Sequence, residues 1–173
     1  KLQEYLKTLG MDLSHLAQFK PGFISVMMMA MELQKSQLAG EGVDSYFNKI
    51  ANKDNKPIEY LESSDFQMSL ISTMGEGNED QFILTNISQM KDLKDIFADA
   101  IAAWRKGDSQ KVNSLLIEPL AIEDPKSHKK LMIDRNNNWL PKIEKMLKDK
   151  DVEYVLVGVG HLVGKGNVIE LLE

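Results

Sequence analysis

The sequence predicts an α/β fold in which a predominantly helical chain packs on a small, mostly parallel sheet that is incomplete at both ends. Three observations predict this fold. Apolar residues recur at helical spacing along most of the 173 residues. Residues 152–158 are instead β-branched and almost continuously apolar, as in a central strand covered on both faces. Pro57–Leu61 reads as a second extended segment; two strands do not make a normal sheet, so we expect the remaining strands outside this chain.

The N-terminal elements follow from leucine spacing and from helix-start and helix-stop residues. Leucines at i, i+4 and i+7 predict a helix over residues 2–9, which Gly10 ends. A second helix should begin at Pro21 and carry a run of methionines to about residue 37. We interpret these methionines as adaptable core filler, with an exposed groove for a partner peptide as the alternative. Asp44 is placed to cap a third helix.

Helical periodicity continues through the rest of the chain, apart from the predicted strand. Ser64-x-x-Gln67 resembles a capping box that opens a helix closing near Gly75. A long periodic stretch predicts one continuous helix over residues 79–106, and Asp108 is placed to cap the next, shorter helix. Further helices are expected over residues 127–148 and at the C-terminal end of the sequence.

Composition and motifs exclude several function classes. The formal charge of −5 argues against a nucleic-acid binder, which usually carries a basic patch. The absence of cysteine excludes disulfides, cysteine zinc sites and a thiol nucleophile. The longest apolar run, Phe23–Met31, falls far short of the roughly 20 residues that span a bilayer. Motifs for serine hydrolases, kinases and dinucleotide binding are also absent, so no organic cofactor is predicted.

His161 is the first candidate functional residue. It follows the predicted strand within a glycine-rich stretch, where Gly158, Gly160 and Gly164 would allow sharp turns and the close approach of a ligand. Open α/β sheets bind ligands at the carboxyl ends of their strands, and an imidazole there can hold a metal or transfer a proton. A hydrogen-bonded structural histidine in a turn is the alternative.

Glu62 is the second candidate, because it follows the extended segment Pro57–Leu61. If that segment runs parallel to residues 152–158, Glu62 and His161 lie on the same rim of the sheet. A carboxylate and an imidazole there could bind a divalent cation or form an acid–base pair. The alternative is an exposed glutamate placed favourably near a helix N-terminus.

Arg135 and Asn136 are the remaining candidates. Both border the predicted apolar stripe of their helix, which is defined by Met132, Trp139, Ile143 and Met146. A charge at such a position must be paired or must line a cavity, because burial without a partner is costly. Arg135 could clamp a substrate carboxylate. An internal salt bridge to a carboxylate such as Glu62 is the alternative.

The chain resembles the TraB/PrgY/GumN family, which includes the Tiki metalloproteases. Short motifs that occur in the family's order carry this resemblance along most of the chain. They are Phe19-Lys20-Pro21, Gly42-Val43-Asp44, Leu61-Glu62-Ser63 with Gln67, Trp104-Arg105-Lys106-Gly107-Asp108, Arg135-Asn136 with Trp139, and Gly158-Val159-Gly160-His161-Leu162-Val163-Gly164.

The resemblance implies an α/β domain with a metal-dependent hydrolytic site, built from two Gly-x-x-His motifs and an acidic residue. His161 matches the second of these motifs. The first motif, the early strands and the accompanying acidic residue are expected N-terminal to Lys1, and a last strand is expected after the final helix. Residues 1–173 would then be a single TraB/GumN-like domain within a longer protein. Family members are often exported or membrane-associated, which favours such a location over the cytoplasm.

Three functions remain as hypotheses. In the first, the chain is the core of a metal-dependent, peptidase-like hydrolase that uses Mn, Co or Zn. His161 would then bind the metal, Glu62 would be a ligand, its partner or a general base, and Arg135 and Asn136 would orient substrate or stabilise an oxyanion. The second is a non-catalytic module that binds a peptide or partner. The third is a metal-independent, esterase-like hydrolase, suggested by a distant similarity between this family and erythromycin esterases. A truncated sheet would expose its edges, so a homodimer is also predicted.

Overall fold

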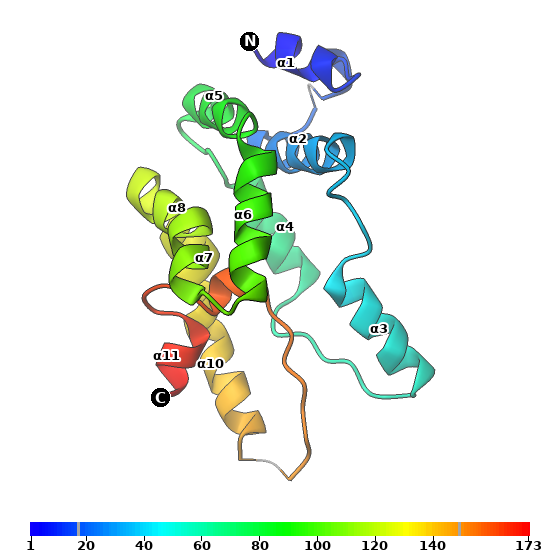
Figure 1. Cartoon of the computed structure of the whole chain (residues 1–173), viewed down its shortest axis with the longest axis vertical. Helices are drawn as coiled ribbons and strands as arrows, with labels where there is room; N and C mark the ends of the chain where they lie inside the picture. Colours follow the sequence, from blue (N-terminus) through cyan, green and yellow to red (C-terminus); the bar gives the residue numbers. More distant parts are fainter. Residues whose placement is uncertain (17, 149) are drawn as a thin grey trace. The chain divides into compact units, whose positions relative to one another are not determined.

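A computed structural model describes residues 1–16, 18–148 and 150–173, and in these residues helices form all the regular structure (Figure 1). The predicted α/β fold with a parallel sheet is therefore wrong, since the described residues contain no strand. Contacts divide the chain into two compact units. Unit 1 comprises Lys1–Lys56 and Ser64–Phe97, and unit 2 comprises Pro57–Ser63 and Ala98–Glu173.

The helical elements follow one another along the chain. In order they are α1 Leu2–Thr8, η1 Leu13–His15, α2 Pro21–Lys35, α3 Val43–Lys53, α4 Ser64–Ser72, α5 Glu79–Gln89, α6 Leu93–Arg105, α7 Ser109–Leu116, α8 Glu118–Glu123, α9 Pro125–His128, η2 Lys129–Ile133, α10 Asp134–Met146, η3 Val159–His161 and α11 Val168–Leu172.

Unit 1 is built around α2, which packs against α4 and α5. Met28 is fully buried in the unit's core, which confirms that this part of the methionine run fills the interior. Helix α2 approaches α4 so closely at Gly22 that a Cβ there would overlap the carbonyl oxygen of Ile71. The Tyr5 hydroxyl donates to Glu32 of α2 over 3.0 Å, and its pKa is raised by burial and by that carboxylate.

Two details of the predicted helices are wrong. The stretch expected as one helix over residues 79–106 is divided into α5 and α6, with a turn between them at residues 90–92. Met90 and Leu93 are both buried at this turn. Gly42, and not Asp44, occupies the N-cap of α3, and Asp44 lies in its first turn.

Unit 2 contains two apolar clusters that hold its helices together. The first joins Ala103, Val112, Ile117 and Val163, and the second contains Trp139, Ile143 and Val168. The Asp108 side chain accepts a hydrogen bond of 2.9 Å from the backbone N–H of Lys111, which confirms the predicted cap of α7.

The predicted strand over residues 152–158 does not form. The segment is irregular, with Val152 wholly exposed and Tyr154 69% exposed, while Val157 is partly buried against the Trp139 cluster. β-Branched residues favour a strand only where neighbouring strands pair and pack with it, and the described residues supply no such strand. Pro57–Leu61 is likewise irregular rather than a strand, and Leu61 lies in a bend.

Candidate functional site

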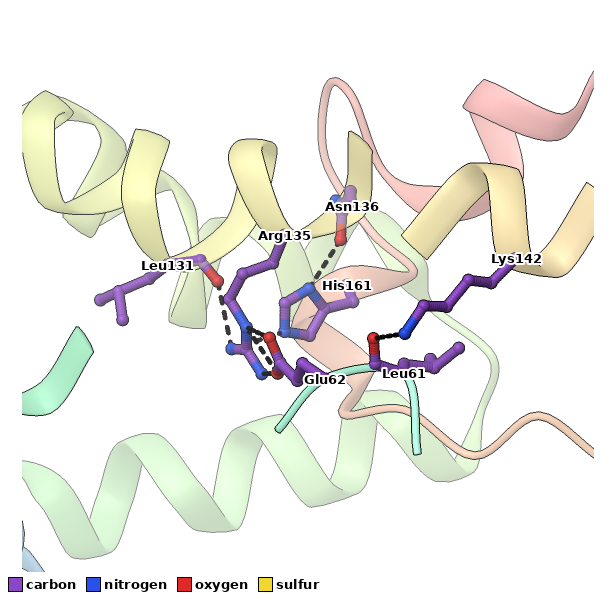
Figure 2. A network of polar contacts seen from close by, with 7 residues as sticks. All are labelled: Leu61, Glu62, Leu131, Arg135, Asn136, Lys142 and His161. Carbon is purple, nitrogen blue, oxygen red and sulfur yellow. Dashed lines mark hydrogen bonds and ion pairs between the residues drawn. The ribbon is translucent and has the colours of Figure 1, made fainter. Parts of the chain in front are cut away.

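The structure brings all four candidate side chains together within unit 2. Figure 2 shows Glu62, Arg135, Asn136 and His161 joined by a continuous series of polar contacts. They come from the irregular segment before α4, from the first turn of α10 and from η3. The four candidate residues therefore lie together, but helices and irregular chain hold them instead of the expected sheet rim.

Local backbone geometry aims Arg135 and Asn136 at the site. Helix α10 continues directly from η2, a π-helical turn over Lys129–Ile133. Such turns change the direction in which the following side chains point, and they are frequent at functional sites. Arg135 Nη1 donates back to the Leu131 carbonyl over 3.2 Å, which holds the guanidinium against this turn.

Glu62 and Arg135 form an ion pair. Arg135 Nε lies 3.0 Å from Oε1 and 3.2 Å from Oε2 of Glu62, and Nη2 also donates to Oε1. The Glu62 side chain is 10% exposed and that of Arg135 18%. The salt bridge that the sequence offered as an alternative is therefore present. Lys142 fixes the segment that carries Glu62, because its Nζ donates to the Leu61 carbonyl over 2.6 Å (Figure 2).

His161 is buried and has a polar neighbour on each ring nitrogen. Nδ1 lies 2.7 Å from Oδ1 of Asn136, and Nε2 lies 3.2 Å from Nη1 of Arg135. A guanidinium can only donate, so Nε2 is the acceptor in that contact. Burial, reinforced by the positive charge of Arg135, lowers the pKa of His161 to about 4, while the carboxylate of Glu62 acts weakly in the opposite direction. The imidazole is thus neutral near pH 7.

Asn136 is 2% exposed, and both ends of its amide are engaged. Its Nδ2 donates to the Gly166 carbonyl over 2.8 Å, while Oδ1 faces His161. These contacts favour a role in holding the histidine. The sequence-based expectation that Asn136 itself orients substrate remains a prediction.

Trp139 belongs to the same site, and sequence analysis assigned it only to the apolar stripe of its helix. Its ring centroid lies 4.4 Å from that of His161, and the guanidinium carbon of Arg135 lies 4.9 Å from its centroid. Trp139 is 3% exposed, and within the described residues its indole Nε1 has no hydrogen-bond partner. The i, i+4 spacing of Arg135 and Trp139 is consistent with this contact on one helix face.

The glycines of the motif serve different purposes. Gly164 has φ +78°, and a Cβ there would overlap Oδ1 of Asn113, so both conformation and space require glycine. At Gly160 a Cβ would lie 2.8 Å from Cδ1 of Ile117, so this glycine admits a neighbouring side chain. Gly158 has φ −60° and meets nothing closer than 3.9 Å. The expectation that all three admit a ligand remains untested.

Comparison with known families decides the relationship that the sequence motifs indicated. The sequence pattern of the TraB/PrgY/gumN family matches residues 1–173, which is the whole chain. The chain belongs to this family. No curated protein and no solved structure shows significant similarity to it. The family membership of the TraB/PrgY/gumN protein is therefore shown, and its side chains are the remaining evidence on its chemistry.

The donors at the site can be tested against the divalent metal that the resemblance implies. Nε2 of His161 and the Glu62 carboxylate both contact the guanidinium of Arg135, so a nitrogen and an oxygen donor already converge on a cation. Imidazole and carboxylate are suitable ligands for zinc, cobalt and manganese. The described residues include no group of three or more His, Cys, Asp or Glu side chains placed to hold a metal. The site of the TraB/PrgY/gumN protein thus supplies two donors whose chemistry fits a divalent metal, Nε2 of His161 and the Glu62 carboxylate.

No helix in the described residues of the TraB/PrgY/gumN protein is both long enough and apolar enough to cross a membrane.

Proposed function

We propose that this TraB/PrgY/gumN protein is the core of a metal-dependent hydrolase that acts on peptides, with His161 as a metal ligand. One observation carries the proposal: a neutral imidazole nitrogen and a carboxylate converge on a single cationic group, the guanidinium of Arg135. Donors gathered around a positive charge are what a divalent metal ion needs, and these two are of suitable chemical type. Family membership supports the same assignment.

Each side chain has a distinct role in the proposed reaction. His161 would hold the metal through Nε2, and Glu62 would be a second ligand or the base that accepts a proton. A bound divalent metal supplies a water molecule whose pKa is lowered toward neutrality. Arg135 would leave Nε2 and offer its N–H donors to the substrate carbonyl oxygen as negative charge develops there. Peptides are proposed as substrates because the motifs resemble a family that includes peptide-processing members.

Metal titration tests the assignment of His161. The metal-free chain is titrated calorimetrically with Mn²⁺, Co²⁺ and Zn²⁺, beside His161→Ala and the control His128→Ala, which changes a histidine of unit 2 outside the site. We expect one metal ion per chain in the wild type and the control, and none in His161→Ala. Metal binding that is equal in all three proteins, or absent from all three, would contradict the proposal.

A cleavage assay separates the proposed hydrolase from its alternatives. The Co²⁺-loaded chain is incubated with a peptide library, and the products are identified by mass spectrometry, with and without exhaustive chelation. Cleavage that stops on chelation and is lost in His161→Ala is expected. Cleavage that survives chelation would indicate the metal-independent hydrolase. Peptide binding without cleavage would indicate the non-catalytic module.

A further inference from the structure

We propose that Asn136 is a positioning residue that, held by the Gly166 carbonyl, fixes the proton of His161 on Nδ1 and its lone pair on Nε2. The tautomer follows from the contacts alone, and its importance for a reaction rests on the proposed function. The inference identifies Nε2 as the atom through which His161 acts.

The amide of Asn136 can be oriented in only one way. The Gly166 carbonyl accepts hydrogen bonds and cannot donate, so the amide group facing it over 2.8 Å must be the Nδ2 donor. The reverse orientation would bring two oxygens together. Oδ1 is then the atom that faces His161 Nδ1 over 2.7 Å, and this oxygen only accepts. Nδ1 therefore carries the proton.

Arg135 supports the same tautomer from the other side of the ring, but its hold on the ring is weaker. Its Nη1 lies 3.2 Å from Nε2, which is longer than the contact with Asn136, and the same nitrogen also donates to the Leu131 carbonyl. Its Nε and Nη2 donate to Glu62 on the other side of the guanidinium. Arg135 can therefore leave Nε2 while Asn136 keeps the proton on Nδ1.

The polar series connects two parts of the fold. Asn136 lies on α10, whereas Gly166 lies in the loop between η3 and α11 and has φ +71°. The carbonyl of this loop fixes the amide, and the amide fixes the imidazole. Metal-binding histidines usually donate their second ring N–H to an oxygen in this manner, which sets the tautomer and the ring orientation.

Nuclear magnetic resonance of the ¹⁵N-labelled wild-type chain tests the tautomer directly, without metal or substrate. The sequence has three histidines, so His161→Gln identifies the signals of His161 by their loss. Long-range ¹H–¹⁵N correlations near pH 7 should show Nδ1 protonated and Nε2 unprotonated. A proton on Nε2, or an average of the two tautomers, would overturn the proposal.

Variants then separate Asn136 from Arg135. Arg135→Met should retain the Nδ1-protonated tautomer, and adding Asn136→Leu should convert it to a mixture. Adding Asn137→Leu is the matched control, because Asn137 is the exposed neighbour on α10 and donates to the Ile133 carbonyl. Loss of the tautomer in Arg135→Met alone, or its retention in Arg135→Met/Asn136→Leu, would overturn the role of Asn136. Should Arg135→Met not fold, Glu62→Met/Arg135→Met provides the same background without an unpaired carboxylate, and the wild-type spectrum remains decisive.

Metal affinity distinguishes a failure of this inference from a failure of the proposed function. Asn136→Leu should weaken Co²⁺ binding by roughly 10- to 100-fold, and Asn137→Leu should leave it unchanged. Co²⁺ binding through His161 with a proton on Nε2 in the metal-free chain would refute the tautomer and leave the proposed function standing. The expected tautomer with no metal binding would refute the proposed function alone.

Discussion

Glu62 and Arg135 stand 73 residues apart in the sequence and meet in unit 2, where Nε of the arginine contacts both carboxylate oxygens of the glutamate. Both side chains are largely buried, so each charge depends on the other for its stability. The pair also places a guanidinium against His161, where it contributes to the low pKa of the imidazole. Structure and candidate chemistry thus depend on the same contact.

Breaking this ion pair should destabilise unit 2. Glu62→Ala leaves a mostly buried guanidinium without its carboxylate, and we expect a loss of roughly 3 kcal/mol in the free energy of unfolding, at the lower end for buried pairs. Both tryptophans, Trp104 and Trp139, lie in unit 2, so tryptophan fluorescence in a urea titration reports on this unit. Glu59→Ala, an exposed glutamate of the same segment, is the control.

The apolar double replacement Glu62→Met/Arg135→Met should recover much of that loss, because it removes both charges together. A double-mutant cycle over the two positions then gives their coupling energy. A coupling energy indistinguishable from zero would show that the two charges do not depend on each other.

Acid should destabilise unit 2 through His161. Its pKa is about 4 in the folded chain and near 6.5 when unfolded, so between these values the unfolded chain takes up a proton that the folded chain does not. The free energy of unfolding should therefore fall by up to about 3 kcal/mol as the pH decreases from about 6.5 to 4, with no contribution from this group above that range. Fluorescence-monitored urea titrations across this interval measure the effect.

His161→Gln should show a shallower pH dependence, while Arg135 and Glu62, the charged groups that face the ring, are retained. His128→Gln, outside the network, should keep the wild-type slope. An unchanged slope in His161→Gln would mean that His161 takes up its proton equally in both states.

Gly164 and Gly158 should respond differently to alanine. Gly164→Ala forces a side chain into a left-handed backbone conformation and against Asn113, and it should cost about 1–3 kcal/mol of stability. Gly158→Ala has room and an ordinary φ, so its free energy of unfolding should remain near that of the wild type. Urea titration of the two variants side by side checks the contrast, and equal effects would contradict it.

Unit 1 offers a similar pair in Gly22 and Gly40. A Cβ at Gly22 would overlap the Ile71 carbonyl, so Gly22→Ala must separate α2 from α4 and should lower the melting temperature by several degrees, corresponding to roughly 1–3 kcal/mol. Gly40→Ala meets open space and should have little effect. Circular dichroism melts measure the difference, because the tryptophans do not report on this unit. A Gly22→Ala chain that melts like the wild type would show that α2 and α4 can shift without cost.

Local signals in the sequence predicted the helices well. Pro21 opens α2, and Asp108 caps α7, because helix-start chemistry depends on nearby backbone groups. The strand over residues 152–158 was predicted wrongly, since its composition indicates a preference that only a partner strand can satisfy. The turn between α5 and α6 was missed for a related reason, because helical periodicity continues across it.

The candidate site shows the same division between local and distant information. Arg135 was placed at the edge of an apolar face from spacing alone, and its salt bridge to Glu62 was one of the two alternatives considered. The contact of Asn136 with Gly166 could not be predicted, because it depends on the path of a loop 30 residues further along the chain. Trp139 was assigned to the core, and only three-dimensional packing shows its ring against the imidazole.

Unit 2 is discontinuous in sequence, since Pro57–Ser63 belongs to it while the residues on both sides belong to unit 1. This short segment therefore contributes Glu62 to unit 2, and the rest of the unit begins only at Ala98. An excised Ala98–Glu173 peptide would carry His161 and Arg135 but would lack the carboxylate that neutralises the guanidinium. A contiguous excision therefore separates the candidate site from one of its own charged members.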